Sequence, residues 1–442
     1  MSENTAALNW LADETLALLT RLDRIRPFVL HETMVPAAAP SRPAQSAIEG
    51  YLVASRRALR RLAYDYLRWL RSPAGRAATP AMAQRRFTFL KLRFNSMLSQ
   101  FDIFADVITQ RSEHETGVWL SGLDVVAADA LAMPNGFIHP PPVVCYLDRG
   151  HGASIRRART RLPGGGENPV AVVRVPRERM VSSGIASSLV HEVGHQGAAL
   201  LDLIVTLRGP LNRLGRSRFG QGPVWSLFSR WISEIVADFW SVSRIGVGST
   251  LGLMSVVSLP RPFVFRISMD DPHPIPWLRV KLSCAMGNAL YPDPQWDRLA
   301  DWWEAYYPLN KQSPAQRRFF RTVEAGIPDF VTLLMNHQPD SLRGESLGRV
   351  MMLPDRTPEA LRFLQRSWGN QFQPMRRAPP SLVFAVVGQA RADRRIGPAT
   401  ESTLLSHLLT YWALRSTLDI ADTYAAQVRE QLAAGVRWGQ AA

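Results

Sequence analysis

The sequence predicts a mainly helical α+β protein with a small sheet near the middle of the chain. Through residues 1–133, apolar side chains recur every three or four positions, which is the period of an amphipathic helix. From Gly136 on, short valine-rich runs are typical of strands. Helical periodicity then returns. We therefore expect a helical N-terminal domain at 1–133, a domain containing the sheet at 134–335 and a helical C-terminal region at 336–442.

The composition is that of an ordinary globular protein. Of its 442 residues, 46% are hydrophobic and 20% are charged, so extensive disorder is not expected. The 52 basic and 37 acidic side chains give a net charge of +15, and only three of the basic residues are lysines. This excess attracts polyanions, either nucleic acid or an anionic membrane, although a GC-rich genome also enriches arginine.

Other features of the chain indicate its compartment. Cys145 and Cys284 are far apart in sequence and belong to no CxxC pair, as expected of a reduced compartment. The first residues, MSENTAALNWLADETLALL, include acids and no basic segment, so no secretory signal is predicted. The longest stretch of low charge, 245–260, is too short to span a bilayer. We expect a cytoplasmic protein, with export by a specialised secretion machine as the alternative.

Two long helices are predicted in the N-terminal domain after a loop at PAAAPSRPAQ, residues 36–45. Seven apolar residues step by three or four through the first and are expected in the core: Phe87, Leu90, Phe94, Met97, Phe101, Phe104 and Ile108. Four others begin the second: Trp119, Leu123, Ala127 and Leu131.

An arginine-rich helix is predicted at 55–72, SRRALRRLAYDYLRWLRS. Its apolar face is expected to contain Leu59, Leu62, Tyr66 and Trp69, with the arginines around the rest. The helix either packs this face on its domain and exposes the arginines to water, or docks an anionic surface.

The predicted strands are VVCYL at 143–147, SIRRARTRL at 154–162 and VAVVRV at 170–175. The run PGGGENP lacks the Gly-Lys-Ser/Thr ending of a phosphate loop, and GVGSTLG at 246–252 lacks the GxGxxG spacing, so both are predicted to be turns or helix starts. In the C-terminal region, MNHQPDSLRGES and PMRRAPPS are predicted linkers around helices such as STLLSHLLTYWAL.

The run SLVHEVGHQGAAL, residues 188–200, contains a candidate metal motif. Two histidines four apart lie on one face of a helix, so His191 and His195 could bind one ion, with Glu192 beside its open position. A random HExxH is expected only about 0.007 times in such a chain. We predict a helix from Ser182 or Ser183 to about Leu207. The alternative is a buried helix with two hydrogen-bonded histidines.

A third ligand is predicted on the helix SRWISEIVADFWSV, residues 229–242. Glu234 would complete a site for one zinc ion per chain, and Asp238, one turn later, would accept a hydrogen bond from the far nitrogen of a ligating histidine. The alternative is a pair of acids that face solvent.

These residues resemble those of the gluzincin metallopeptidases, which have HExxH on one helix and ExxxD on the next. The form ExxAD is similar to that of the CAAX prenyl protease and HtpX group, whose members also have a histidine-proline pair and a later arginine. DDPHPIPWLR supplies these as His273, Pro274 and Arg279. The resemblance covers about 180–280, without the group's transmembrane helices, and implies a zincin-like catalytic domain around the HExxH helix.

The resemblance implies a role for each residue in peptide hydrolysis. Glu192 would be the general base, and His273 would stabilise the developing oxyanion. Arg279 would either brace the site or pair with a substrate carboxylate, while His273 could instead be only a turn residue. VAVVRV could be a sheet edge to which a peptide adds as a strand, or could pack only against the core.

The sequence therefore predicts a soluble zinc metalloendopeptidase that acts on protein or peptide substrates. Two other classes stay open: a catalytically inactive zincin-fold binding protein, and a basic adaptor for nucleic acid or a membrane surface.

Overall fold

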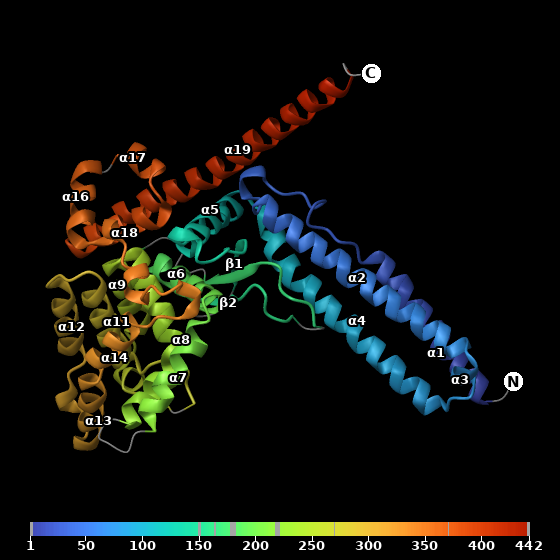
Figure 1. Ribbon diagram of the computed structural model, residues 1–442, viewed down its shortest axis with the longest axis horizontal. Helices are drawn as coiled ribbons and strands as arrows, with labels where there is room; N and C mark the ends of the chain where they lie inside the picture. Colours follow the sequence, from blue (N-terminus) through green and yellow to red (C-terminus); the bar gives the residue numbers. More distant parts are fainter. Residues whose placement is uncertain are drawn as a thin grey trace.

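The computed structural model describes residues 3–148, 152–162, 165–176, 183–216, 222–268, 270–369 and 371–439. The fold is mainly helical with one three-stranded sheet, which confirms the predicted α+β class at this level (Figure 1). Among the described residues, no helix is both long and apolar enough to cross a membrane.

Helices α1 (Glu3–Arg24), α2 (Arg42–Arg71) and α4 (Pro80–Thr109) pack side by side, with α3 (Pro73–Arg76) between α2 and α4. They form an arm that extends away from the rest of the molecule (Figure 1). Ser41 and Thr79 cap the starts of α2 and α4, because their side chains accept hydrogen bonds from unpaired backbone amides. All seven predicted core residues of α4 are buried, as expected.

The predicted apolar face of the arginine-rich helix is correct in part. Leu59 and Tyr66 are buried between the helices of the arm, but Leu62 is 47% exposed. Leu62 therefore does not contribute to the core. The predicted loop at 36–45 contains a short 3-10 turn and ends where α2 begins at Arg42.

The sheet consists of β1 (Val143–Asp148), β2 (Ser154–Arg156) and β3 (Ala171–Pro176), in the order β1-β3-β2. Strand β1 is parallel to β3 and pairs Cys145 with Val173, whereas β2 is antiparallel and pairs Ile155 with Val173. Of the two alternatives for VAVVRV, the free sheet edge is wrong, because β3 is paired on both sides. The predicted strand 154–162 is also too long, since β2 ends at Arg156.

Side chains cover the outer edge of β1. Gln110 hydrogen-bonds both the backbone amide and the carbonyl of Leu147, at 2.8 Å each. The amide of Cys145 donates to Asp124 at 2.7 Å, and Cys145 O accepts from the buried Arg111. Arg111 also pairs with Asp124 and donates to Ala38 O.

The main core is formed by helices of the remaining chain around α6 (Ser183–Leu200) and α8 (Gly222–Ile245). Their principal neighbours are α5 (His114–Leu131), α7 (Leu203–Gly215), α9 (Val247–Val257), α11 (Pro276–Leu290) and α18 (Pro380–Ala392). The four predicted core residues of α5 are buried. The start of α9 at Val247 agrees with the predicted helix start in GVGSTLG.

The HEVGH helix is shorter than predicted. Helix α6 ends at Leu200, and Asp202 adopts a left-handed conformation with φ of 52°, which separates α6 from α7. Ser182, one of the two predicted caps, lies outside the described residues.

Further helices complete the C-terminal half of the chain: α10 (Arg261–Val264), α12 (Gln295–Tyr306), α13 (Pro314–Ala325), α14 (Ile327–Met335), α15 (Leu347–Met351), α16 (Pro358–Trp368), α17 (Phe372–Arg377) and α19 (Pro398–Gly439). The linker predicted after Met335 separates α14 from α15 and contains a 3-10 turn. The linker predicted at PMRRAPPS is partly helical, since α17 continues to Arg377. The domain boundaries at 133 and 335 stay predictions.

Candidate metal centre

Two glycines on α6 allow it to pack closely against α8. A Cβ atom on Gly197 would lie 2.3 Å from the Trp240 ring, and one on Gly194 would lie 2.9 Å from Ala237 O. Real Cβ atoms do not approach so closely, so only glycine fits at these two positions. The close contact brings the polar residues of the two helices to one point.

His191 and His195 of α6 and Glu234 of α8 meet at this point. Each offers one ligand atom, and these atoms lie within 4.8 Å of one another. Glu234 Oε2 lies 3.2 Å from His191 Nε2, and Glu234 Oε1 lies 3.4 Å from His195 Nε2. The structure therefore brings together the three residues that the sequence predicts as ligands.

The surroundings of Glu234 fit a cation. Its Oε2 is buried and makes no hydrogen bond within the described part of the chain. Nitrogens of His191, His273 and Arg279 nevertheless lie 3.2 to 3.6 Å from this oxygen. A buried acceptor without a hydrogen bond is costly unless another group satisfies it, and a metal ion among the ligand atoms would do so.

The charges of the site also fit a divalent cation. Glu192, Glu234 and Asp238 contribute three negative charges and Arg279 one positive charge, which leaves −2 with neutral histidines. The donor set of two imidazoles and one carboxylate is one that zinc uses in catalytic sites, where the fourth position remains for water or substrate.

Asp238 and Arg279 hold His191 in place. His191 Nδ1 lies 2.8 Å from Asp238 Oδ1, so its Nε2 is the nitrogen that faces Glu234. Arg279, on α11, donates to both oxygens of Asp238, at 2.7 and 2.9 Å. Of the two roles predicted for Arg279, this geometry favours bracing the site, because its side chain is only 12% exposed and its guanidinium is bound to Asp238.

Two contributors to the site were not predicted from the sequence. Ser233 Oγ lies 3.3 Å from His195 Nδ1, the ring nitrogen that faces away from Glu234. Asp271 holds His273 in position through Oδ1, which accepts from the His273 backbone amide at 2.9 Å and lies 2.8 Å from its Nδ1. The short spacing of Asp271 and His273 is the only sequence signal for this pair.

The structure brings His273 and Glu192 to the site in different environments. The His273 side chain is 51% exposed, with its Nε2 3.3 Å from Glu234 Oε2, so it borders the site from the solvent side. Glu192 is buried. Burial raises the pKa of the Glu192 carboxyl, as does the charge of Glu234, while His191 opposes the shift.

Burial and mutual charges separate the pKa values of the two histidines. Burial lowers the pKa of His191, but Asp238 and Glu234 outweigh this and raise it to about 9. Burial and the charge of His191 lower the pKa of His195 to about 4. Burial opposes ionisation of Glu234, but its close contact with His191 and the neighbouring positive charges lower the pKa to about 2. The site therefore attracts positive charge, whether a proton or a metal ion.

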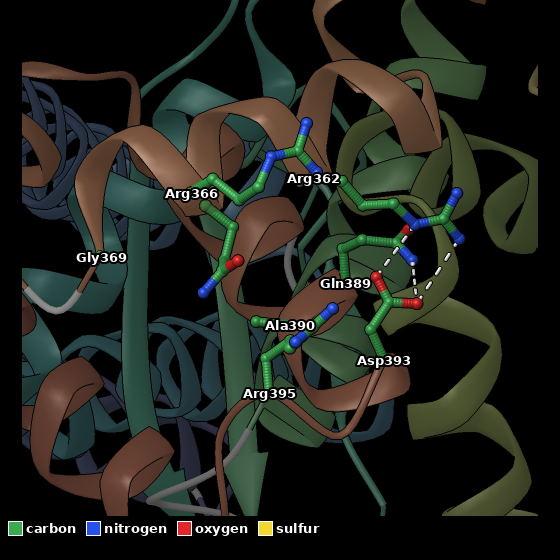
Figure 2. A pocket seen from close by; sticks show the side chains of 8 residues that line it. Arg362, Arg366, Gly369, Gln389, Ala390, Asp393 and Arg395 are labelled. Atoms are coloured by element: carbon green, nitrogen blue, oxygen red, sulfur yellow. Dashed lines mark hydrogen bonds and ion pairs between the residues drawn. The ribbon is translucent and has the colours of Figure 1, made fainter.

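A concavity of about 610 Å³ lies between α16 and α18 (Figure 2). Arg362, Arg366 and Arg395 line it, together with Gln389 and Asp393. Arg362 pairs with Asp393 at 3.0 Å and with Asp293 at 2.7 Å. None of the site residues predicted from the sequence lines this pocket.

No protein-family model, curated protein or solved structure matches this chain.

Proposed function

We propose that this chain is a zinc-dependent metallopeptidase of the gluzincin type, with Glu192 as its general base. One observation carries the proposal: the ligand atoms of His191, His195 and Glu234 lie within 4.8 Å of one another, around a buried carboxylate oxygen without a hydrogen bond. The resemblance to the CAAX prenyl protease and HtpX group gains support from the same geometry. HExxH, ExxAD and HPxxxxR lie far apart in sequence, yet residues of all three are in contact.

His191, His195 and Glu234 would hold the ion, and their helices would form a zincin-like catalytic part. When bound, zinc supplies a Lewis acid that makes water a nucleophile near neutral pH and polarises a carbonyl. Asp238 and Ser233 orient the two imidazoles through their far nitrogens, which keeps the near nitrogens aimed at the ion. Arg279 in turn fixes Asp238.

Glu192 moves the proton. It accepts a proton from the attacking water as the water oxygen bonds to the scissile carbonyl carbon, and it then donates this proton to the amide nitrogen as the carbon–nitrogen bond breaks. Its burial beside the ligands keeps competing water away from this carboxylate. His273, at the exposed side of the site, would donate a hydrogen bond to the carbonyl oxygen as negative charge develops there.

The decisive experiment measures metal content and activity on the same preparation. We expect about one zinc per chain and cleavage of peptide bonds in casein or a peptide library. Glu192→Gln should keep the zinc and the fold but lose nearly all turnover, because the amide cannot accept the proton. Glu359→Gln, at an exposed position of α16, serves as the matched control and should keep full activity.

Each failure has a distinct meaning. A purified chain that binds no zinc would refute the metal centre itself. Zinc binding without cleavage of any peptide in the library would leave a zinc-binding protein and refute the peptidase. Normal turnover by Glu192→Gln would place the base elsewhere.

A further inference from the structure

The arm contains an open apolar groove, far from the residues of the metal centre in sequence. It lies between α2 and α4, has a volume of about 740 Å³ and is lined on its apolar side by Tyr51, Leu59, Leu62, Tyr66, Phe89 and Met97. Two of these lining residues, Leu62 and Phe89, are 47% and 65% exposed to solvent. Where large exposed apolar side chains gather around a concavity, the surface is usually a binding site.

Positive charge predominates around this groove, although Glu167 also lines it. Residues 42–109, which include α2 and α4, contain 12 basic and four acidic side chains, a net charge of +8 out of the chain's +15. Arg86 and Arg93 of α4 line the groove, and the Arg86 guanidinium lies over the Trp69 ring at 4.1 Å. On α2, the exposed Arg57 and Arg61 each precede a lining residue by one position. A ligand must therefore combine apolar surface with negative charge.

The length of the groove and the spacing of its charges favour a helix as that ligand. The lining residues of α2 run from Tyr51 to Tyr66, about 22 Å of helix. Arg86 and Arg93 are two turns apart, about 10 Å along α4. A lipid carries its charge at one end, whereas an amphipathic helix presents acidic groups at every turn beside its apolar anchors.

The groove is also bounded, which argues against a flat membrane surface. Gly165, Gly166 and Glu167 line it as well, and a Cβ atom on Gly166 would lie only 2.6 Å from the Tyr51 ring. This backbone therefore packs directly against the Tyr51 end of the groove.

We propose that the groove between α2 and α4 binds an acidic amphipathic helix of a partner protein. The apolar face of that helix would cover Leu62 and Phe89, and its acidic side chains would pair with Arg86 and Arg93. The proposal goes beyond the metallopeptidase and does not depend on it, because no metal-centre residue takes part.

The test uses the full-length chain and a fluorescent helical peptide of about 15 residues, with leucines on one face and glutamates on the other. We expect saturable binding by fluorescence anisotropy that weakens as salt is added. Phe89→Ser and Arg86→Glu should each weaken binding at least about tenfold. Mass spectrometry verifies that the peptide stays intact.

Matched controls lie on the same helix. Leu92, at 56% exposure, and Arg85 do not line the groove, so Leu92→Ser and Arg85→Glu should change affinity by less than about twofold. Equal weakening by the groove and control variants would overturn the proposal, as would equal binding of a scrambled peptide of the same composition. If the protein binds phosphatidylglycerol vesicles but not the helical peptide, the ligand of the groove is a membrane and the proposed helix is refuted.

Discussion

Asp238 connects His191 and Arg279, two largely buried side chains of the candidate metal centre. Its Oδ1 lies near His191 Nδ1, and its two oxygens accept both hydrogen bonds from Arg279. Burial raises the pKa of Asp238, but the charges of Arg279 and His191 outweigh this and hold it well below its usual range. A neutral amide here would remove the charge of the carboxylate that accepts two hydrogen bonds from the guanidinium, and would leave Glu234, at 3.6 Å, as its nearest ion-pair partner.

Asp238→Asn should therefore destabilise the fold and weaken zinc binding together. We expect a loss of about 3 kcal/mol in the free energy of unfolding, because a largely buried arginine loses its closest ion-pair partner, and a 10- to 100-fold weaker affinity for zinc. Urea unfolding and zinc titration measure the two effects. Asp271→Asn, at a 52% exposed side chain, should change stability by less than about 1 kcal/mol. A stable Asp238→Asn protein with normal affinity would contradict the assigned role.

His273→Ala tests the donor at the solvent side of the site. If His273 stabilises the transition state alone, zinc content and KM should stay nearly unchanged while kcat falls by roughly 10²- to 10³-fold, or about 3 to 4 kcal/mol. All three quantities are measured on one preparation. Loss of zinc would make His273 a ligand or a structural prop, and an unchanged kcat would make it a turn residue.

The sequence predicts that the candidate ligands and Asp238 lie together, but it does not predict every residue that holds the ligands in place. His191, His195, Glu234 and Asp238 are predictable because helical spacing alone fixes which residues share a face. Ser233 has no such signal, since its contact with His195 depends on how α8 rotates against α6.

At the scale of elements, the contact between α6 and α8 determines the geometry of the site. Helical periodicity predicts both helices, and glycines within HEVGHQG indicate a close neighbour without identifying it. The central place of β3 and the end of α6 at Leu200 could not be predicted, because one depends on strand pairing and the other on a single left-handed residue.

Gly197→Ala tests this contact. The added methyl group would overlap the Trp240 ring, so we expect a loss of about 1 to 3 kcal/mol of stability and weaker zinc binding as the helices separate. Gly209→Ala on α7 is the control: its Cβ atom would meet only Arg213 Nη1 at 3.7 Å, and better helix propensity should leave it neutral or more stable by up to about 1 kcal/mol. Equal stability of the two variants by thermal or urea unfolding would show that the close contact is unimportant.

At the scale of the whole molecule, a buried thiol and a buried phenol hydroxyl predict how the free energy of unfolding changes at alkaline pH. Burial raises the pKa of the Cys284 thiol from 9.0 to about 12 and that of the Tyr291 hydroxyl from 10.0 to about 12. The unfolded chain loses these protons first, so it binds fewer protons than the folded chain above pH 9. The stability that these two groups contribute should be fully present below pH 9 and should be lost as pH rises toward 12.

Cys284→Ala isolates one contribution to this loss. Between pH 9 and 10.5, the thiol should account for up to about 2 kcal/mol of the decrease in unfolding free energy. The variant should therefore lose less stability over this range than the parent, measured by urea unfolding with reductant present. Tyr291 and Cys145 are still present in this variant, so its unfolding free energy should still decrease with pH, but less steeply. Parallel pH profiles for the two proteins would contradict the assignment.

The interactions at the outer edge of β1 also determine how the arm is attached. Arg111 lies in the 3-10 turn that follows α4 and hydrogen-bonds to three separate segments, at Ala38, Asp124 and Cys145. Gln110 ties the same end of α4 to Leu147. A base held by several buried bonds resists bending far more than a flexible linker would. The arm should therefore reorient together with the body as one elongated particle, so that a helix bound in its groove would be carried at a fixed distance from the metal centre.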